Sequence, residues 1–564
     1  MRRRNFLGAM GAAPGAAAQT SKPPASSQQN AAEPRVFFFD DGRHAAGLYQ
    51  FEPPLTAADH VYTVDQLIRS GVDTYVYGAT LEGGVAQYDS RVAQKWGDNV
   101  QKWKHVVWYR ASRVLHQLIA DGHDPLKLLI DRCHQNGIWF LASCYVNLAG
   151  GDRATHGGLG RKSDFVYDHP EFQVGPDSDP RARDLPADRF NFLHPELQRE
   201  RFAVAEELLT RFETDGIELN LADPDLPFPF CRFSEAGKLA PELTEWMRRV
   251  KAAARAAEEA QGRRKRIYAR IPAHPDTWPI AGYEVPRWVR EGLVDGLICV
   301  SNDAEIMDQD LHLEAAVRLT RGHPCRVLAS FSNTLMRQLK KYATPPMIWA
   351  AAASAYAQGA DGFGLGDAHW TPNGWPWTSD EYSTLRLLGH PELLATADKH
   401  YHVRSAQQGA APRRSWLPGA QRHLPRRLSA GETVELPLRV ADDLASFQRE
   451  QKLKSVRLQV RLTNFQPSGD RIRVELNGVP LPESSAEKND LTYRLLDSAA
   501  ASPYGYVFDY QLAPEQFPAN GRNAIRVTLV QSDATLDLPR EVYDVDCLVE
   551  YRPHRNFQQP PIRY

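Results

Sequence analysis

The chain has 564 residues, of which 42% are hydrophobic and 24% charged, and its formal net charge is -2. This composition is typical of a soluble globular protein, and the length exceeds one ordinary domain but suits a large barrel followed by a smaller module. The near-neutral charge gives no electrostatic basis for binding nucleic acid, so we expect no such partner.

The N-terminus has the features of an export signal. Arg3 and Arg4 are followed by one residue and then Phe-Leu, and a weakly apolar stretch after them ends in three alanines. This order resembles a bacterial twin-arginine signal with a small-residue cleavage site. We expect residues 1–18 to be removed on export to the periplasm or cell exterior, residues 19–34 to be a linker, and no later segment to enter a membrane. The alternative is a disordered basic tail.

Strand and helix patterns alternate between residues 35 and 405. The strand candidates span residues 36–40, 74–77, 138–146, 216–221, 267–271, 296–300, 326–331 and 362–365. Helical patterns separate them; Pro125 opens one such helix and Gly137 ends it. Eight strands, each followed by a helix, predict an α/β fold of the (β/α)8 TIM barrel type. An open doubly wound sheet is the alternative, although no Gly-rich phosphate turn follows the first strand.

A second, all-β region follows a linker at residues 406–415. Its strand candidates span residues 433–440, 455–462, 471–476, 506–512, 524–530 and 546–551. No helix of any length is predicted among them, and Asn477-Gly478 is a strong hairpin signal. The spacing predicts a β-sandwich over residues 416–554, which either binds sugar or shields the barrel.

Cysteine and histidine spacing gives little support for a metal or another cofactor. The six cysteines are dispersed without a CxxC pair, which favours buried thiols over disulfides or zinc ligands. His44, His274 and His369 lie on different predicted loops and have no fixed spacing. We therefore expect no metal and no other cofactor, and the sequence leaves the oligomeric state open.

The fourth predicted strand carries an acid in an otherwise apolar run. Glu218 and Asn220 lie two residues apart and share one face, whereas Ile217, Leu219 and Leu221 share the other. In a barrel the apolar face packs on helices, so the first face points inward. Glu218 then lies near the carboxyl end of its strand, where barrel enzymes keep their chemistry. The alternative is a structural acid that pairs with a buried arginine or backbone amides.

Two carboxylates across a cleft can cleave a glycosidic bond. We expect Glu218 to be the general acid, with Asp303 or Asp367 as its catalytic partner. Side chains at other strand ends and in the following loops are candidates for binding substrate. They are Asp40, Tyr145, Asn147, Asn220, Arg270, His274, Asn302, His369, Trp370, Trp375 and Trp377. The three tryptophans would stack on a sugar ring or pack on the barrel rim, and Asp303 is alternatively a solvated loop charge.

Four motifs carry a family resemblance. They are HPEF at residues 169–172, FNFLHPELQRER at 190–201, DGIELN at 215–220 and GHPELLATADKHY at 389–401. Together they resemble an uncharacterised group of bacterial glycoside-hydrolase-like barrel proteins, which implies a TIM barrel that hydrolyses carbohydrate. The chain departs from this group at Asn220, where an Asp is usual. It departs from chitinase-type barrels at Ala222, which takes the place of their catalytic Glu.

The leading hypothesis is therefore a glycoside hydrolase that acts on an oligo- or polysaccharide. A carbohydrate-binding barrel without catalysis is the alternative, because of Asn220 and because the seventh predicted strand ends without a carboxylate. A sugar-phosphate lyase or aldolase is a weaker third hypothesis, since it would need a Lys at a strand end or a phosphate site after strands seven and eight. No Lys is predicted at a strand end, which counts against Schiff-base chemistry.

Overall fold

The computed structural model describes residues 33–42, 53–222, 228–303, 307–332, 334–336, 341–366, 377–405, 416–489 and 505–552. Within these ranges, eight parallel strands close into a barrel in the order β1-β10-β7-β6-β5-β4-β3-β2. They are β1 (Val36–Asp40), β2 (Thr74–Gly78), β3 (Trp139–Tyr145), β4 (Gly216–Asn220), β5 (Arg266–Pro272), β6 (Gly296–Val300), β7 (Arg326–Phe331) and β10 (Gly362–Gly366). The barrel prediction is confirmed, and the open sheet is excluded.

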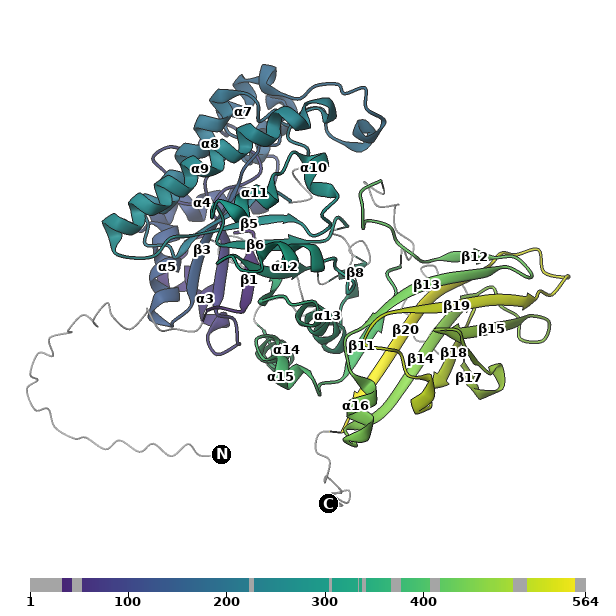
Figure 1. The fold of residues 1–564 in the computed structure, drawn as a ribbon. Helices are drawn as coiled ribbons and strands as arrows, with labels where there is room; N and C mark the ends of the chain where they lie inside the picture. The colour runs from purple at the N-terminus through teal and green to yellow at the C-terminus, as the bar shows by residue number, and fades with distance from the viewer. Residues whose placement is uncertain are drawn as a thin grey trace, which may run out of the picture. The chain divides into compact units, whose positions relative to one another are not determined.

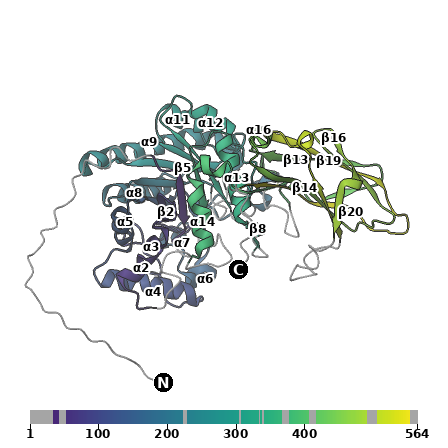
Figure 2. The same cartoon turned by 90° about the horizontal axis from the view of Figure 1, so that it is seen from below.

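Helices surround the barrel strands (Figures 1 and 2). The longer ones are α4 (Val106–Ala120), α5 (Pro125–Gln135), α8 (Pro195–Thr210), α9 (Ala236–Gln261), α13 (Pro345–Ala357) and α14 (Ser379–Leu388). The shorter ones are α2 (Ala57–His60), α3 (Tyr62–Leu67), α6 (Arg153–His156), α7 (Asp164–Asp168), α10 (Thr277–Ala281), α11 (Val285–Arg290), α12 (Glu314–Thr320) and α15 (Pro391–Leu394). Among the described residues, no helix is both long enough and apolar enough to cross a membrane.

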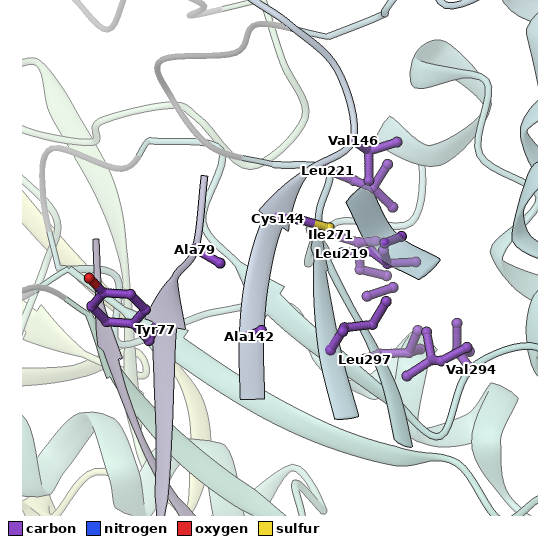
Figure 3. Packing of buried hydrophobic residues seen from close by; sticks show 14 of the residues in the cluster. Tyr77, Ala79, Ala142, Cys144, Val146, Leu219, Leu221, Ile271, Val294 and Leu297 are labelled. Carbon is purple, nitrogen blue, oxygen red and sulfur yellow. The ribbon is translucent and has the colours of Figure 1, made fainter. Parts of the chain in front are cut away.

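The two faces of each barrel strand bury different residues. On β4, Leu219 belongs to the large apolar cluster between strands and helices, and Figure 3 shows it with Leu221 beside Ile271. The interior holds a separate apolar cluster that includes Leu141 and Tyr268. The predicted alternation of β4 is therefore confirmed: Ile217 and Leu219 face the helices, so Glu218 and Asn220 face inward.

Glycines at the N-terminal ends of barrel strands leave room for large inward side chains. A Cβ at Gly296 would lie 2.4 Å from the Tyr268 ring, and one at Gly362 would lie 2.5 Å from Leu328. Gly216 is the most constrained, because its φ is +152° and a Cβ there would lie 2.0 Å from the Arg266 carbonyl oxygen. The interior is thus a packed core and not a pore.

Gly216→Ala is expected to lower the free energy of unfolding by about 2 kcal/mol or more, because it adds a backbone clash to an unfavourable φ. Gly237→Ala is the control, since a Cβ at this position in α9 meets nothing within 4 Å. Urea unfolding of both variants checks the prediction. Equal stability of the two would contradict the packing described here.

The C-terminal region is a β-sandwich, as predicted. One sheet contains β11 (Lys399–His402), β20 (Arg540–Tyr551), β14 (Leu453–Thr463), β18 (Gly505–Gln511), β17 (Ala486–Asn489) and β12 (Arg426–Leu428). The other contains β13 (Thr433–Val440), β19 (Gly521–Gln531), β15 (Arg471–Leu476) and β16 (Val479–Leu481). Leu458 of the first sheet and Val474 of the second lie in one buried apolar cluster. The sheets therefore pack face to face.

Two local predictions about the sandwich have different outcomes. Leu476 pairs with Val479, and Asn477 and Gly478 between them have φ of 52° and 80°, so the hairpin is confirmed. The expectation that no helix interrupts the strands is wrong, because α16 (Leu444–Arg449) follows β13. The Asp443 carboxylate accepts a hydrogen bond from the Ser446 amide and caps this helix. A helix of six residues is too short for its apolar periodicity to be recognised in the sequence.

All six cysteines are buried and unpaired, as the sequence predicted. Burial raises the pKa of the Cys144 and Cys299 thiols to about 12. These thiols are therefore protonated at neutral pH and act as small apolar groups of the core.

His60 makes stability depend on pH. One ring nitrogen lies 3.1 Å from the Pro125 carbonyl oxygen, and burial lowers the pKa of His60 to about 4. The folded state therefore binds fewer protons than the unfolded state between about pH 6.5 and pH 4. The contribution of His60 to stability is present above this window and is lost as the pH falls through it.

His60→Gln is expected to show less acid destabilisation than the wild type, by about 3 kcal/mol between pH 7 and pH 4. Urea unfolding at several pH values gives this difference. Burial also raises the pKa of Asp73 to about 6, so protonation of Asp73 stabilises the folded state in the same pH window. The effect of His60 is therefore the difference between the pH profiles of the variant and the wild type. Parallel pH profiles for the two proteins would contradict the assignment.

Candidate functional site

Glu218 and Arg270 form an ion pair inside the barrel. Glu218 is on β4 and Arg270 on β5, and Arg270 Nε donates to Glu218 Oε1. The Glu218 side chain is fully buried and that of Arg270 is 10% exposed. Arg270 Nη1 also donates to Ser330 Oγ on β7 at 3.2 Å. The structure thus brings together two predicted site residues and adds a serine from β7, which is separated from β5 by β6 alone.

The second carboxylate oxygen of Glu218, Oε2, is buried and accepts no hydrogen bond from the described part of the chain. Burying a carboxylate oxygen without a partner costs free energy, so such a group in a native fold invites a functional explanation. A carboxylate that accepts an arginine hydrogen bond through one oxygen has the geometry of a nucleophile or of a group that stabilises positive charge.

Small and aromatic side chains surround this ion pair. Phe39 on β1 packs on the interior cluster, is partly exposed, and its ring centroid lies 4.6 Å from the Arg270 guanidinium. Ser143 on β3 pairs in register with Glu218 and is buried. Sequence reasoning missed Phe39, Ser143 and Ser330 as site residues. Their only signal was their inward position near the strand ends, because none of them carries a charge.

Other predicted residues of strands three and four lie at the same end of the barrel. Tyr145 and Asn220 are paired in register and buried, and the Asn220 side-chain oxygen accepts from the Ala222 amide at 3.3 Å. Asn147 donates to the Phe190 carbonyl oxygen at 2.8 Å, which fixes the loop after β3. Asn220 and Asn147 therefore fix the backbone of the loops after β4 and β3.

Asn302 and Asp303, two residues predicted to be in the site after β6, bind residues 418 and 422. Arg422 donates to both carboxylate oxygens of Asp303, from Nε at 2.6 Å and from Nη2 at 3.1 Å. Asn302 donates to the Pro418 carbonyl oxygen at 2.7 Å. The His274 ring lies beside His312, and burial and this neighbour lower the pKa of His274. A bidentate arginine contact favours a structural role for Asp303 over catalysis.

Two predicted substrate-binding residues lie on the wrong side of the barrel wall. Trp377 is buried and contacts Phe38 edge-to-face at 5.3 Å, between β1 and α14, so it is a core residue and not a sugar platform. Asp40 accepts from the Tyr75 hydroxyl at 2.5 Å and from the Gly42 amide at 2.8 Å. Burial and the Asp40 charge raise the pKa of Tyr75 well above its ordinary value.

The remaining candidates, Asp367, His369, Trp370 and Trp375, follow β10 and lie outside the described residues, as does His44.

Comparisons with known proteins give weak likenesses. No family model and no curated protein matches the chain. Among solved structures, the chain is similar to the PgaB (BpsB) glycoside hydrolase domain from Bordetella bronchiseptica, at 15% identity and a TM-score of 0.40, over 63% of this chain and 98% of that one. It is also similar to an alpha-amylase from Anoxybacillus, at 12% identity and a TM-score of 0.36, over 88% and 98% of the two chains. A third is the maltogenic alpha-amylase AmyB from Thermotoga neapolitana, at 10% identity and 0.36, over 86% and 98%.

Proposed function

We propose that this chain hydrolyses a glycosidic bond in an oligo- or polysaccharide and that Glu218 is its charged catalytic carboxylate. One observation carries the proposal: Glu218 lies inside the barrel near the carboxyl ends of the strands, with one oxygen held by Arg270 and the other open. Strand ends of this kind are where barrel enzymes place their reacting groups.

The arrangement suits the charge that develops when a glycosidic bond breaks. The sugar becomes positively charged in the transition state, and a fixed carboxylate stabilises that charge or attacks the anomeric carbon. Arg270 keeps Glu218 oriented through its hydrogen bond and through its contact with Ser330. Phe39 offers a partly exposed ring to the apolar face of a sugar.

A proton donor is also required, and Asp367 after β10 is the proposed one. Retaining and inverting enzymes differ in the separation of their two carboxyl groups, about 5 Å against about 6.5–9.5 Å. The configuration of the released sugar therefore decides between the two mechanisms. A nuclear magnetic resonance time course of the first product measures it directly.

A screen of the mature protein on plant, algal and microbial glycans tests the proposal. Release of reducing sugar by the wild type, and its loss in Glu218→Gln, is the expected result. Unchanged release in Glu218→Gln would overturn the site, and the absence of both release and binding would overturn the carbohydrate function.

A carbohydrate-binding barrel without catalysis is the second candidate. Asp303, the other strand-end carboxylate with a described side chain that the sequence favoured, is engaged by Arg422. Isothermal titration with the same glycans distinguishes the two functions, because a binding barrel would take up a glycan without releasing sugar.

We also propose that the chain is exported. The proposal rests on Arg3, Arg4 and the small-residue stretch that follows them. Replacing both arginines by lysine is expected to retain the protein in the cytoplasm, as cell fractionation would show. Export of the double variant at the wild-type level would contradict it.

A further inference from the structure

Residues 416–422, which lie in the chain between β11 and β12 of the sandwich, make buried contacts with the barrel. Leu417 and Ala420 are fully buried in the same apolar cluster as the barrel core. Asn302 after β6 donates to the Pro418 carbonyl oxygen, and Arg422 is held by Asp303. The Arg422 and Asp303 side chains are 4% and 2% exposed. We call residues 416–422 the crossing segment.

Arg404 also donates a hydrogen bond to the crossing segment. Its Nη2 donates to the Gly419 carbonyl oxygen at 2.7 Å, and its Nη1 donates to Asp308 at 2.8 Å. Gly419 has a φ of +72°, and a Cβ there would lie 3.3 Å from the His274 ring. The backbone at Gly419 therefore runs close to the loop after β5, with fixed contacts to the loops after β5 and β6.

Trp416, the first described residue of the crossing segment, joins an aromatic and charged cluster. It is partly buried and contacts Phe233 edge-to-face at 5.3 Å. The Arg181 guanidinium lies 4.4 Å from the Phe233 ring and 6.0 Å from the Trp416 ring, and Arg181 is paired with Asp179 at 2.6 Å. Arg181 belongs to the loop after β3 and Phe233 to the loop after β4.

This cluster has the chemistry that a sugar ring requires. Sugars have an apolar C–H face that packs on an aromatic ring and hydroxyl groups that bond to charged or amide side chains. Trp416 supplies a partly exposed ring that packs on the buried Phe233, and the Arg181–Asp179 pair supplies a donor and an acceptor beside it. The loops after β3 to β6, which hold the cluster and the crossing segment, follow the carboxyl ends of strands, the end near which Glu218 lies.

We propose that the crossing segment forms the wall of the carbohydrate site beside β5 and β6 and that Trp416 contacts a sugar unit distant from the cleaved bond. The inference rests on the proposed function and extends it: Asp303 and Arg422 are positioning residues for Trp416 and take no part in catalysis. A substrate that spans both places would need Trp416, whereas a small one would not.

The experiment compares a short and a long substrate of the same linkage. The probes are nitrophenyl monoglycosides and the long oligosaccharides of the glycan series used in the screen. Trp416→Ala is expected to lower kcat/KM for the long oligosaccharide about tenfold and to leave the nitrophenyl glycoside unchanged, because uniform binding of a distant unit is lost. Arg422→Met should reproduce this loss, and Arg422→Lys should restore part of it.

Arg439→Met is the matched control. Arg439 is also a buried arginine of the C-terminal region paired with acids of the barrel region, Asp310 at 2.5 Å and Glu314 at 2.7 Å, and neither of these ion pairs involves the crossing segment. It should not alter the ratio of long to short kcat/KM. Equal losses on both substrates in Trp416→Ala, or the same ratio in Arg422→Met and Arg439→Met, would overturn the inference while Glu218 remains essential. If the wild type neither hydrolyses nor binds any probe, the inference and the proposed function both fail.

Discussion

Glu218→Gln is expected to lower the rate of glycan hydrolysis by about a thousandfold or more, the usual cost of losing a catalytic carboxylate. The amide has the same shape. Its carbonyl oxygen can accept the Arg270 hydrogen bond, and its NH₂ group takes the place of the open oxygen Oε2. The fold should therefore persist while the negative charge is lost. Sugar release at saturating substrate, with circular dichroism of both proteins, measures the effect.

Glu207→Gln is the control for this loss. Glu207 is also a buried glutamate, but it lies on α8 and accepts from the Tyr88 and Ser90 hydroxyls outside the barrel. We expect Glu207→Gln to affect stability and not the rate per folded molecule. A similar loss of rate in both variants would mean that buried carboxylates matter here only for folding.

Arg270→Met is expected to lower the free energy of unfolding by about 3–5 kcal/mol at neutral pH, because it leaves a buried carboxylate without its cation. Urea unfolding at neutral pH measures it. The double variant with Glu218→Gln should be more stable than Arg270→Met alone, as coupling requires.

Arg540→Met is the control that distinguishes a loss of stability from a loss of hydrolysis. Arg540 forms a comparable buried pair with Asp470 in the sandwich, with side chains 3% and 0% exposed. It should cost similar stability and leave hydrolysis unchanged. If Arg270→Met retained full activity, Arg270 would not be the group that orients Glu218.

The sequence predicted the barrel well because strand alternation is a local property. The eight predicted barrel strands agree with the structure to within one residue at each end. The inward direction of Glu218 followed from the period of two residues in β4. The pairing of Glu218 with Arg270 did not follow, because it depends on which side chains meet across two strands 52 residues apart.

Contacts across longer separations account for the less successful predictions. Asp303 and Asn302 stand at a strand end, as site residues do, but they bind Arg422 and Pro418 more than a hundred residues later. Trp377 was expected in a rim loop, and its burial against Phe38 depends on how the chain returns to α14. No periodicity in the sequence reports such contacts.

The most direct measurement is a crystal structure of Glu218→Gln with the oligosaccharide that the wild type cleaves. The account predicts a sugar ring inside the barrel mouth, within about 3 Å of the side chain at position 218 and in contact with Phe39. A sugar bound only elsewhere, for example on the sandwich, with the barrel interior closed above Arg270, would contradict it.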